Sequence, residues 1–298
     1  MNIEQEIMYT GWKKWYPTND EWSVLATFSG DISLEIVQKD FPELKLPDLT
    51  ENEYLLVYDE DNKLKAHYCK RGDHLKKFGR NSIKNRFLES ALKPVNDEQV
   101  AAFDLMCNDN ITVKVLTGNY GSGKTMLLVN QALNLLEHNK VKRIIWLRNN
   151  IAVEDTGNLG ALPGTEFEKL LPFLGPMIDH VGSEQDIQYM VEKRQLQVPF
   201  LGHIRGRNIT DSIIICTEAQ NLTMKQIKLI LGRVAKGSQV WFDGDWRQHD
   251  GKAFKKAKSL RRLTNYLKGN PLFGYVHLQI SERSETAKLA DILPDDED

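Results

Sequence analysis

The stretch that decides the fold is Gly118-Asn119-Tyr120-Gly121-Ser122-Gly123-Lys124-Thr125. An alternating apolar run at residues 111–116 predicts a strand before it, and the helical spacing of apolar residues over 126–136 predicts a helix after it. Strand, Gly-x-x-x-x-Gly-Lys-Thr and helix in this order predict a phosphate-binding loop. The glycines let backbone N–H groups turn toward an anion, and the helix adds the positive end of its dipole. We expect Lys124 to reach the β- and γ-phosphates, and the Thr125 hydroxyl to hold Mg²⁺.

The composition is that of an ordinary globular protein. The chain has 298 residues, of which 41% are hydrophobic and 27% charged, enough for one large domain or two of ordinary size. No apolar run approaches a membrane span, and the N-terminus lacks the layout of a signal peptide. Three widely spaced cysteines, Cys69, Cys107 and Cys216, argue against a disulfide framework or zinc cluster. We therefore expect a cytoplasmic protein without membrane association.

Charge is unevenly distributed, although the net charge is only −2. Basic residues dominate from Lys63 to Lys93, and the run from Lys252 to Lys268 contains no acid. These runs are either a local surface for a polyanion or ordinary solvated faces. Because its apolar residues have helical spacing, the second run is either an exposed helix or a surface that follows a nucleic-acid strand.

Two segments are expected ahead of the domain that holds the loop. Residues 1–20 predict an N-terminal arm whose aromatic side chains pack on nucleic-acid bases, on the chain itself or on a neighbouring subunit. Residues 21–93 predict a small β-rich, OB-like module with strands at 23–28, 54–58 and 63–69. Modules of this type often bind single-stranded nucleic acid.

The domain from residue 94 to 293 is predicted to be α/β, with an acidic tail at 294–298. Pro94 marks its start, and Asn96 is expected to cap the first helix. The expected strands are residues 111–116, 143–147, 212–216, 239–242 and 276–280. Their alternation with helical patterns predicts a parallel sheet that is covered on both faces.

Polar residues follow two of these strands. Glu218 comes after the strand at 212–216 and is the expected catalytic, water-polarising carboxylate. Asp245 and Gln248 follow the next strand and are expected to meet the γ-phosphate. Because the carboxyl ends of parallel strands share one edge of the sheet, these side chains should converge on the nucleotide. A glutamate in such a place is also a common helix cap, so a structural role for Glu218 stays open.

Short motifs follow the loop in a fixed order. They are Leu159–Gly164, Ile204–Arg207, Glu218–Asn221, Gly232-Arg233, Gly244-Asp245 with Gln248 and Asp250, and Glu282–Ser284. Together with the loop, this series resembles the PhoH family of P-loop ATPases, relatives of superfamily 1 helicases. The resemblance implies a RecA-like core that uses ATP and Mg²⁺ and assembles as a ring, here expected to be a hexamer. It also implies that Gln99, in a stretch similar to the helicase glutamine motif, reads adenine.

The resemblance also bears on the partner. Family members fused to a PIN nuclease domain are associated with ATP-dependent RNA unwinding and cleavage, and residues 21–80 resemble the β-module that links the two domains. No PIN domain is recognisable here, so we expect no nuclease activity. The expected partner is RNA or another single-stranded nucleic acid.

Four arginines in the matched motifs are candidates for phosphate contacts. In a ring, Arg233 or Arg283 is expected to act catalytically on a neighbour's γ-phosphate. Arg205 and Arg207 flank a glycine and are expected to hold nucleic-acid phosphate. For any one of them, a surface ion pair is an equally good interpretation.

One position departs from the family pattern Asp-Glu-Ala-Gln-Asn. Here the sequence reads Thr217-Glu218-Ala219-Gln220-Asn221. The aspartate normally brings negative charge near Mg²⁺, and Thr217 keeps the hydrogen bond but not the charge. With Thr125, Thr217 and Asp245 as the expected metal site, we predict weaker Mg²⁺ binding, slower hydrolysis and intact nucleotide binding. Compensation by Asp245 or Asp243 is the alternative.

Three functions therefore compete. The first is an ATPase that binds or unwinds RNA or another single-stranded nucleic acid, with turnover that RNA stimulates. The second is a nucleotide-dependent binding switch with weak hydrolysis. The third is an ATP-driven protein remodeller, for which the basic runs would be incidental.

Overall fold

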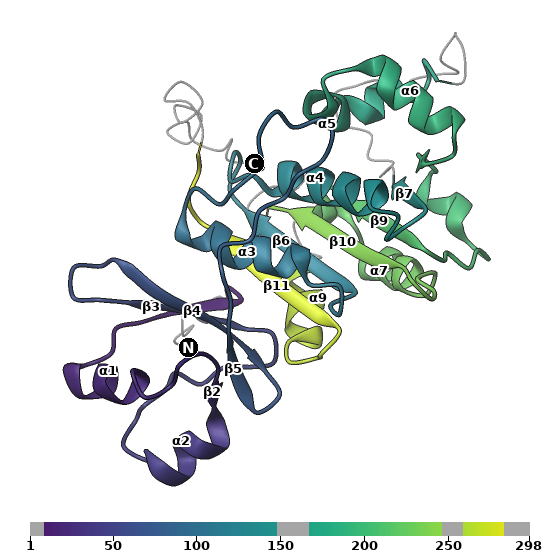
Figure 1. Cartoon of the computed structure of the whole chain (residues 1–298). Helices are drawn as coiled ribbons and strands as arrows, with labels where there is room; N and C mark the ends of the chain where they lie inside the picture. The colour runs from purple at the N-terminus through teal and green to yellow at the C-terminus, as the bar shows by residue number, and fades with distance from the viewer. Residues whose placement is uncertain (1–8, 148–166, 246–258, 283–298) are drawn as a thin grey trace, which may run out of the picture.

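The structure is a computed structural model that describes residues 9–147, 167–245 and 259–282. Two sheets lie side by side (Figure 1): a smaller N-terminal sheet with two short helices, and a larger α/β core. Helix α3 (Asp97–Cys107) lies between them. Among the described residues, no helix is both long and apolar enough to cross a membrane.

The core sheet is parallel throughout. Its strands are β6 (Val113–Gly118), β7 (Arg143–Trp146), β8 (Leu196–Gln197), β9 (Ser212–Cys216), β10 (Gln239–Gly244) and β11 (Phe273–Leu278). They follow the order β11-β6-β10-β9-β7-β8, and every neighbouring pair is parallel. The expected α/β fold with a RecA-like parallel core is therefore confirmed. The last strand begins earlier than expected, at Phe273 instead of residue 276.

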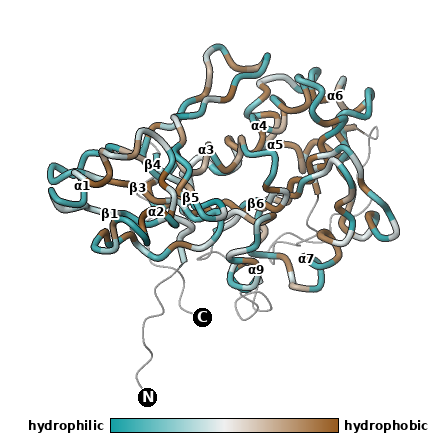
Figure 2. The backbone as a smooth tube through the Cα atoms, turned by 60° about the horizontal axis from the view of Figure 1, so that its bottom comes forward, coloured by the Kyte–Doolittle hydropathy of each residue, from teal (hydrophilic) through white to brown (hydrophobic). Residues whose placement is uncertain are grey.

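Helices cover both faces of this sheet. One face carries α3, α4 (Lys124–Glu137), α5 (Leu171–Val181) and α6 (Glu184–Glu192), and the other carries α7 (Met224–Leu231) and α9 (Ser259–Leu267). Successive strand residues alternate between two apolar clusters: Ile213 and Ile215 pack in one, Ile214 in the other. Figure 2 shows hydrophobic segments mainly inside the molecule and hydrophilic ones mainly in its outer loops. The sheet is thus buried on both sides, as its apolar strands require.

The N-terminal sheet has five strands in the order β1-β3-β4-β5-β2. These are β1 (Trp12–Trp15), β2 (Ile32–Ser33), β3 (Tyr54–Tyr58), β4 (Leu64–Arg71) and β5 (His74–Lys77), accompanied by helices α1 (Asn19–Leu25) and α2 (Leu34–Asp40). The strands expected at 54–58 and 63–69 correspond to β3 and β4. Within the described residues the edge strands β1 and β2 do not pair with each other, so the sheet is open and not a closed barrel.

The N-terminal region differs from expectation at two places. The strand expected at 23–28 is wrong, because helix α1 occupies residues 19–25. A capping box starts this helix: Thr18 Oγ1 accepts from Glu21 N, and Glu21 Oε2 accepts from Thr18 N at 2.8 Å. The structure also places residues 12–15 in the sheet and not in a separate arm, since β1 pairs with β3 in parallel.

Buried contacts fasten the N-terminal sheet to the core. Trp12 Nε1 donates to the carbonyl of His277 at 2.8 Å. Tyr54 Oη and Arg71 Nη2 donate to Asp104 Oδ2 at 3.0 and 2.8 Å. One apolar cluster contains side chains from both sheets and from α3. The N-terminal sheet therefore supports β11, which pairs with the loop strand β6, and α3, which packs against both strands.

Candidate nucleotide-binding site

The loop between β6 and α4 adopts the backbone conformation that its glycines permit. Gly118, Gly121 and Gly123 have φ angles of 149°, 69° and 87°. A Cβ on Gly118 would lie 2.1 Å from the carbonyl oxygen of Leu278, so no side chain fits there. Gly123 is the N-cap of α4, whose first residues are Lys124 and Thr125. The N-terminal end of α4, where the helix dipole is positive, therefore lies at the loop and can attract an anion.

The segment after β11 braces the loop from one side. Asn119 Nδ2 donates to the carbonyl of Gln279 at 3.2 Å, and Ser281 Oγ donates to the carbonyl of Tyr120 at 2.8 Å. The backbone N–H of Glu282 donates to the carbonyl of Gly121 at 3.0 Å. These bonds hold the loop backbone in one conformation and connect it to the edge strand of the sheet.

Gln99 supports the loop through a buried side-chain hydrogen bond. Its side chain is only 4% exposed; Nε2 donates to the carbonyl of Ser122 at 3.2 Å, and Oε1 accepts from Val95 N at 3.0 Å. Asn96 caps α3 as expected, accepting from Gln99 N at 2.9 Å. Gln99 therefore contacts the loop, and its expected role in reading adenine stays a prediction.

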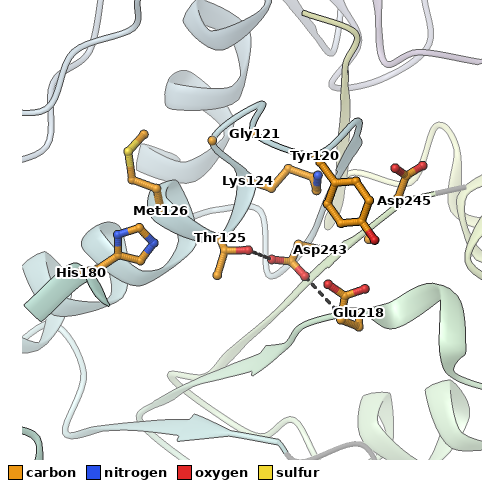
Figure 3. A pocket seen from close by; sticks show the side chains of 11 residues that line it. Tyr120, Gly121, Lys124, Thr125, Met126, His180, Glu218, Asp243 and Asp245 are labelled. Carbon is orange, nitrogen blue, oxygen red and sulfur yellow. Dashed lines mark hydrogen bonds between the residues drawn. The ribbon is translucent and has the colours of Figure 1, made fainter. Parts of the chain in front are cut away.

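A pocket of about 310 Å³ opens in front of the loop. Its lining residues are Tyr120, Gly121, Gly123, Lys124, Thr125, Met126, His180, Glu218, Asp243, Gly244 and Asp245. Figure 3 shows Lys124 and Tyr120 on one side, Met126 and His180 on the other, and the acidic side chains across from Thr125. Lys124 Nζ donates to the carbonyls of Gly118 and Asn119 at 2.7 and 2.8 Å. An ammonium, a hydroxyl and carboxylates therefore converge on one space.

Asp243 is the central carboxylate of this pocket. It lies in β10, which pairs directly with the loop strand β6, opposite Leu116. Its Oδ2 accepts from Thr125 Oγ1 at 2.7 Å, and its Oδ1 accepts from the backbone N–H of Glu218 at 3.0 Å (Figure 3). Burial raises the pKa of Asp243 to about 6, and the charge of Glu218 acts in the same direction. The bond from Thr125 and the charge of Lys124 oppose that rise.

Glu218 sits at the carboxyl end of β9 in a strained conformation. Its φ and ψ are 52° and 41°, in the left-handed region that non-glycine residues rarely adopt. Gln220 Nε2 donates to Glu218 Oε2 at 2.5 Å, and Gln220 Oε1 accepts from Asp245 N at 3.1 Å. Gln220 thus connects the ends of β9 and β10. Such strain at an exposed carboxylate facing a phosphate-binding loop is typical of a functional residue.

The remaining predicted residues fall into three groups. Asp245 lines the pocket, so the structure brings it together with the loop and Glu218. Thr217 follows β9 and is half-buried, but it is not one of the lining residues. Gln248 and Arg283 lie outside the described residues.

The arginines expected to bind phosphate lie at another place. Arg233 Nη1 donates to the carbonyl of Arg207 at 3.5 Å, and Arg207 Nη2 donates to Gln197 Oε1 at 3.1 Å. A bridge between Ile209 and Val234 puts this pair just before β9 and β10 begin. That is the edge of the sheet opposite the pocket. Arg233 is therefore remote from the nucleotide pocket of its own chain, and Arg205 is exposed.

Sequence reasoning missed two contributors to the pocket and underrated a third. Met126 follows the motif, and His180 comes from α5, far away in sequence, so no motif pointed to His180. Burial lowers the pKa of His180, which favours its neutral form. Asp243 was expected only as an alternative to Thr217. The signal that could have found it is its place at the end of a strand next to the loop strand.

The donor set fits a nucleotide with Mg²⁺. Loop N–H groups and Lys124 suit phosphate oxygens, and the Thr125 hydroxyl with nearby carboxylates suits a hard cation. Within the described residues, no group of three or more His, Cys, Asp or Glu side chains could hold a metal ion alone.

Comparisons with known proteins agree with this geometry. The sequence model of the PhoH-like protein family matches residues 91–290. Protein PhoH2 of Bacillus subtilis (strain 168) is 34% identical over 209 residues, which cover 67% of this chain and 47% of that protein. Protein PhoH2 of Mycolicibacterium smegmatis is 34% identical over 196 residues, covering 64% and 45%. A PhoH-like protein of Mycobacterium leprae is 39% identical over 145 residues, covering 48% and 41%.

The chain spans about half the length of these curated relatives. A solved structure, the helicase nonstructural protein 10 of an arterivirus, aligns at 12% identity over 88% of this chain and 55% of that one, with a TM-score of 0.29, too low to compare the folds. The family match covers most of the chain and includes the loop, Glu218, Asp243 and Asp245. The chain therefore belongs to the PhoH-like protein family, and its pocket is that of a P-loop nucleotide-binding protein.

Proposed function

We propose that this protein is a Mg²⁺-dependent ATPase that couples nucleotide turnover to the binding or unwinding of RNA or another single-stranded nucleic acid. The observation that carries the proposal is the pocket itself. Lys124 and Thr125 at the start of α4 face Glu218 and Asp243 at the ends of two neighbouring strands. A phosphate cradle opposite a strained, exposed carboxylate is the arrangement that nucleotide hydrolysis needs.

Each side chain has a defined task under this proposal. The loop N–H groups and Lys124 bind and orient the phosphates, and Mg²⁺, when bound, neutralises charge on their oxygens. Thr125 offers its hydroxyl to that ion. Glu218 orients the attacking water, held in place by its bonds to Gln220 and Asp243. Tyr120, which lines the pocket and is 47% exposed, would cover the bound nucleotide.

Assembly and nucleic-acid binding form the less direct part of the proposal. Arg233 lies on the sheet edge opposite its own pocket, so it could reach a γ-phosphate only in a neighbouring subunit. This supports a ring, proposed to be a hexamer, in which Arg233 or Arg283 acts across the interface. Basic residues on β4, β5 and α9, with Arg205 and Arg207, would bind phosphates of the strand. Three free thiols among the described residues suit a cytoplasmic protein.

Phosphate release from ATP, with and without single-stranded RNA, tests the proposal. We expect turnover that needs Mg²⁺ and rises when RNA is added. Glu218→Gln should lower turnover at least about 100-fold while ATP still binds, because it removes the base and keeps the shape. Glu60→Gln, in an exposed turn of the N-terminal sheet, is the matched control and should leave turnover unchanged. Equal turnover in Glu218→Gln and Glu60→Gln would contradict the assignment.

The second candidate function is a nucleotide-dependent binding switch, or a protein remodeller with weak hydrolysis. Thr217 favours it, because the family's carboxylate is missing at that position. A switch predicts ATP-dependent assembly with negligible phosphate release in the same assay. A remodeller predicts turnover that single-stranded RNA does not stimulate, and filter binding to RNA that does not depend on ATP.

A further inference from the structure

Thr217 and Asp243 occupy equivalent places on neighbouring strands. In the parallel pairing of β9 with β10, Cys216 lies opposite Phe242, and these are the last paired residues. Thr217 directly follows β9 and Asp243 is the next residue of β10, so the two occupy matching positions at the carboxyl edge of the sheet. The carboxylate that β9 lacks is therefore present one strand over, and β10 is the strand closer to the loop.

The contacts of Asp243 are those expected of a carboxylate that serves a metal ion. Its side chain accepts the Thr125 hydroxyl proton at 2.7 Å, and its residue is only 2% exposed. A hydroxyl that donates to Asp243 turns its lone pairs away from it, toward the pocket where the phosphates would lie. The Thr125 hydroxyl oxygen is thereby oriented to coordinate a metal ion, with the carboxylate of Asp243 in hydrogen-bond contact on its other side.

The same carboxylate also positions Glu218. Its second oxygen accepts from the backbone N–H of Glu218 at 3.0 Å, at the residue with the left-handed conformation. A purely structural acceptor for this turn would need one neutral oxygen, as in asparagine. Burying an ionised carboxylate costs several kcal/mol more than burying a neutral amide, unless a cation or a strong donor compensates its charge. The combination of both contacts in one acid therefore points to a function for the charge.

We propose that Asp243 supplies the metal-facing negative charge that the family places at position 217. This inference rests on the proposed function, since it concerns the Mg²⁺ that accompanies the nucleotide. It reverses the expectation from the sequence: Thr217 does not weaken Mg²⁺ binding, because the charge has moved across one strand spacing to β10. Slow hydrolysis is then no longer expected from Thr217.

The test is the Mg²⁺ dependence of nucleotide binding in the full chain. A fluorescent, non-hydrolysable ATP analogue is titrated in EDTA and in rising Mg²⁺, which measures binding without turnover. For Asp243→Asn we expect analogue binding in EDTA to be retained or tightened, because a negative charge near the phosphates is removed. Its apparent Mg²⁺ affinity should fall about tenfold or more, the loss typical of one charged partner.

Two matched variants separate the positions. Asp245→Asn, at the neighbouring carboxylate of the same pocket, should lower the apparent Mg²⁺ affinity less than Asp243→Asn does, because Thr125 donates its hydroxyl proton to Asp243. Thr217→Asp should change the apparent Mg²⁺ affinity by less than about threefold, because the charge is already present. Thermal melting without metal shows whether Asp243→Asn folds. If it does not, Thr217→Asp still tests whether the metal-facing charge is already present, because this variant keeps Asp243.

The outcomes are distinct. The inference is overturned if Asp243→Asn keeps its Mg²⁺ dependence, if Asp245→Asn loses it instead, or if Thr217→Asp raises the Mg²⁺ affinity about tenfold. If the unmodified protein binds the analogue neither in EDTA nor in Mg²⁺, the proposed function itself fails. Both are supported if Mg²⁺ strengthens analogue binding by the unmodified protein and this strengthening is lost only in Asp243→Asn.

Discussion

Gly244 shows how closely the residues of the site depend on one another. It separates Asp243 from Asp245, and a Cβ there would lie 2.6 Å from Gln220 Oε1 and 2.9 Å from Leu260 Cδ2. Gln220 needs this position because it bonds both Glu218 and the Asp245 backbone. A side chain at residue 244 would therefore have to displace the side chains of Gln220 and Leu260.

Gly244→Ala tests this dependence. We expect it to displace Gln220, to lower the free energy of unfolding by about 1–3 kcal/mol, and to reduce turnover because Glu218 loses a partner. Chemical denaturation and phosphate release measure the two effects. Gly30→Ala, where a Cβ meets nothing within 4 Å, is the control and should be nearly silent. A Gly244→Ala protein as stable and as active as the control would show that this contact is unimportant.

Much of the site could be predicted at the residue scale, because most of its residues stand close together in the sequence. The loop and Glu218 stand in short motifs whose spacing alone implies their chemistry. Asp243 could be named from the sequence only as an alternative to Thr217, because its role depends on which strand lies next to β6, and strand order is a long-range property. His180 was missed for the same reason, since the packing of α5 brings it to the pocket.

At the scale of elements, β6 contains an unusual buried lysine. Lys114 is fully buried, its Nζ donates to the carbonyl of Met106 at 2.8 Å, and it lies 5.2 Å from the ring centroid of Trp241. Burial lowers the pKa of Lys114 to about 7. Lys114 thus links α3 to the loop strand, through a group that can lose its charge near neutral pH.

Lys114 should make stability depend on pH. The pKa of Lys114 is about 7 in the folded protein and near the ordinary lysine value of 10.5 in the unfolded chain, so between these values the unfolded chain binds more protons. The free energy of unfolding should therefore rise with pH from 7 to 9, by at most about 1.4 kcal/mol per unit from this group. Lys114→Met should remove this rise, as measured by urea denaturation at each pH. Parallel curves for the two proteins would rule the effect out.

The elements themselves were largely predictable. Five of the six described core strands were found because they are apolar on both faces and alternate with helices, whereas β8, only two residues long, was missed. The strand expected at 23–28 was wrong because Thr18 and Glu21 form a capping box, a local signal that outweighs the β-prone residues behind it. The place of β1 could not be predicted, since its parallel pairing with β3 joins residues far apart in sequence.

At the scale of the whole molecule, Asp104 on α3 joins the two sheets. Tyr54 and Arg71 of the N-terminal sheet both donate to it, and Asn81 Nδ2 donates to its other oxygen at 3.3 Å. Because Tyr54 is fully buried, its hydroxyl would lose its acceptor if this carboxylate were removed. The two sheets also share one apolar cluster, so we expect them to unfold in a single transition.

Asp104→Ala should lower the free energy of unfolding by about 1–3 kcal/mol, because it leaves the buried Tyr54 hydroxyl without its acceptor and the partly exposed Arg71 without its partner. Asp31→Ala removes a carboxylate that pairs with Lys76 at an exposed site, and should cost at most about 1 kcal/mol. Calorimetry of both variants measures the loss and the number of transitions. Equal losses, or two separate transitions in the unmodified protein, would show that the sheets are not coupled in this way.

The most direct test of the whole account is the position of the metal ion. Crystals of the protein with Mn²⁺ and a non-hydrolysable ATP analogue would show the ion by its anomalous scattering. We predict phosphates in the loop Gly118–Thr125 and an ion about 2.1–2.3 Å from Thr125 Oγ1, with Asp243 as the nearest carboxylate. A nucleotide bound elsewhere, or an ion at Asp245 and remote from Asp243, would contradict the account.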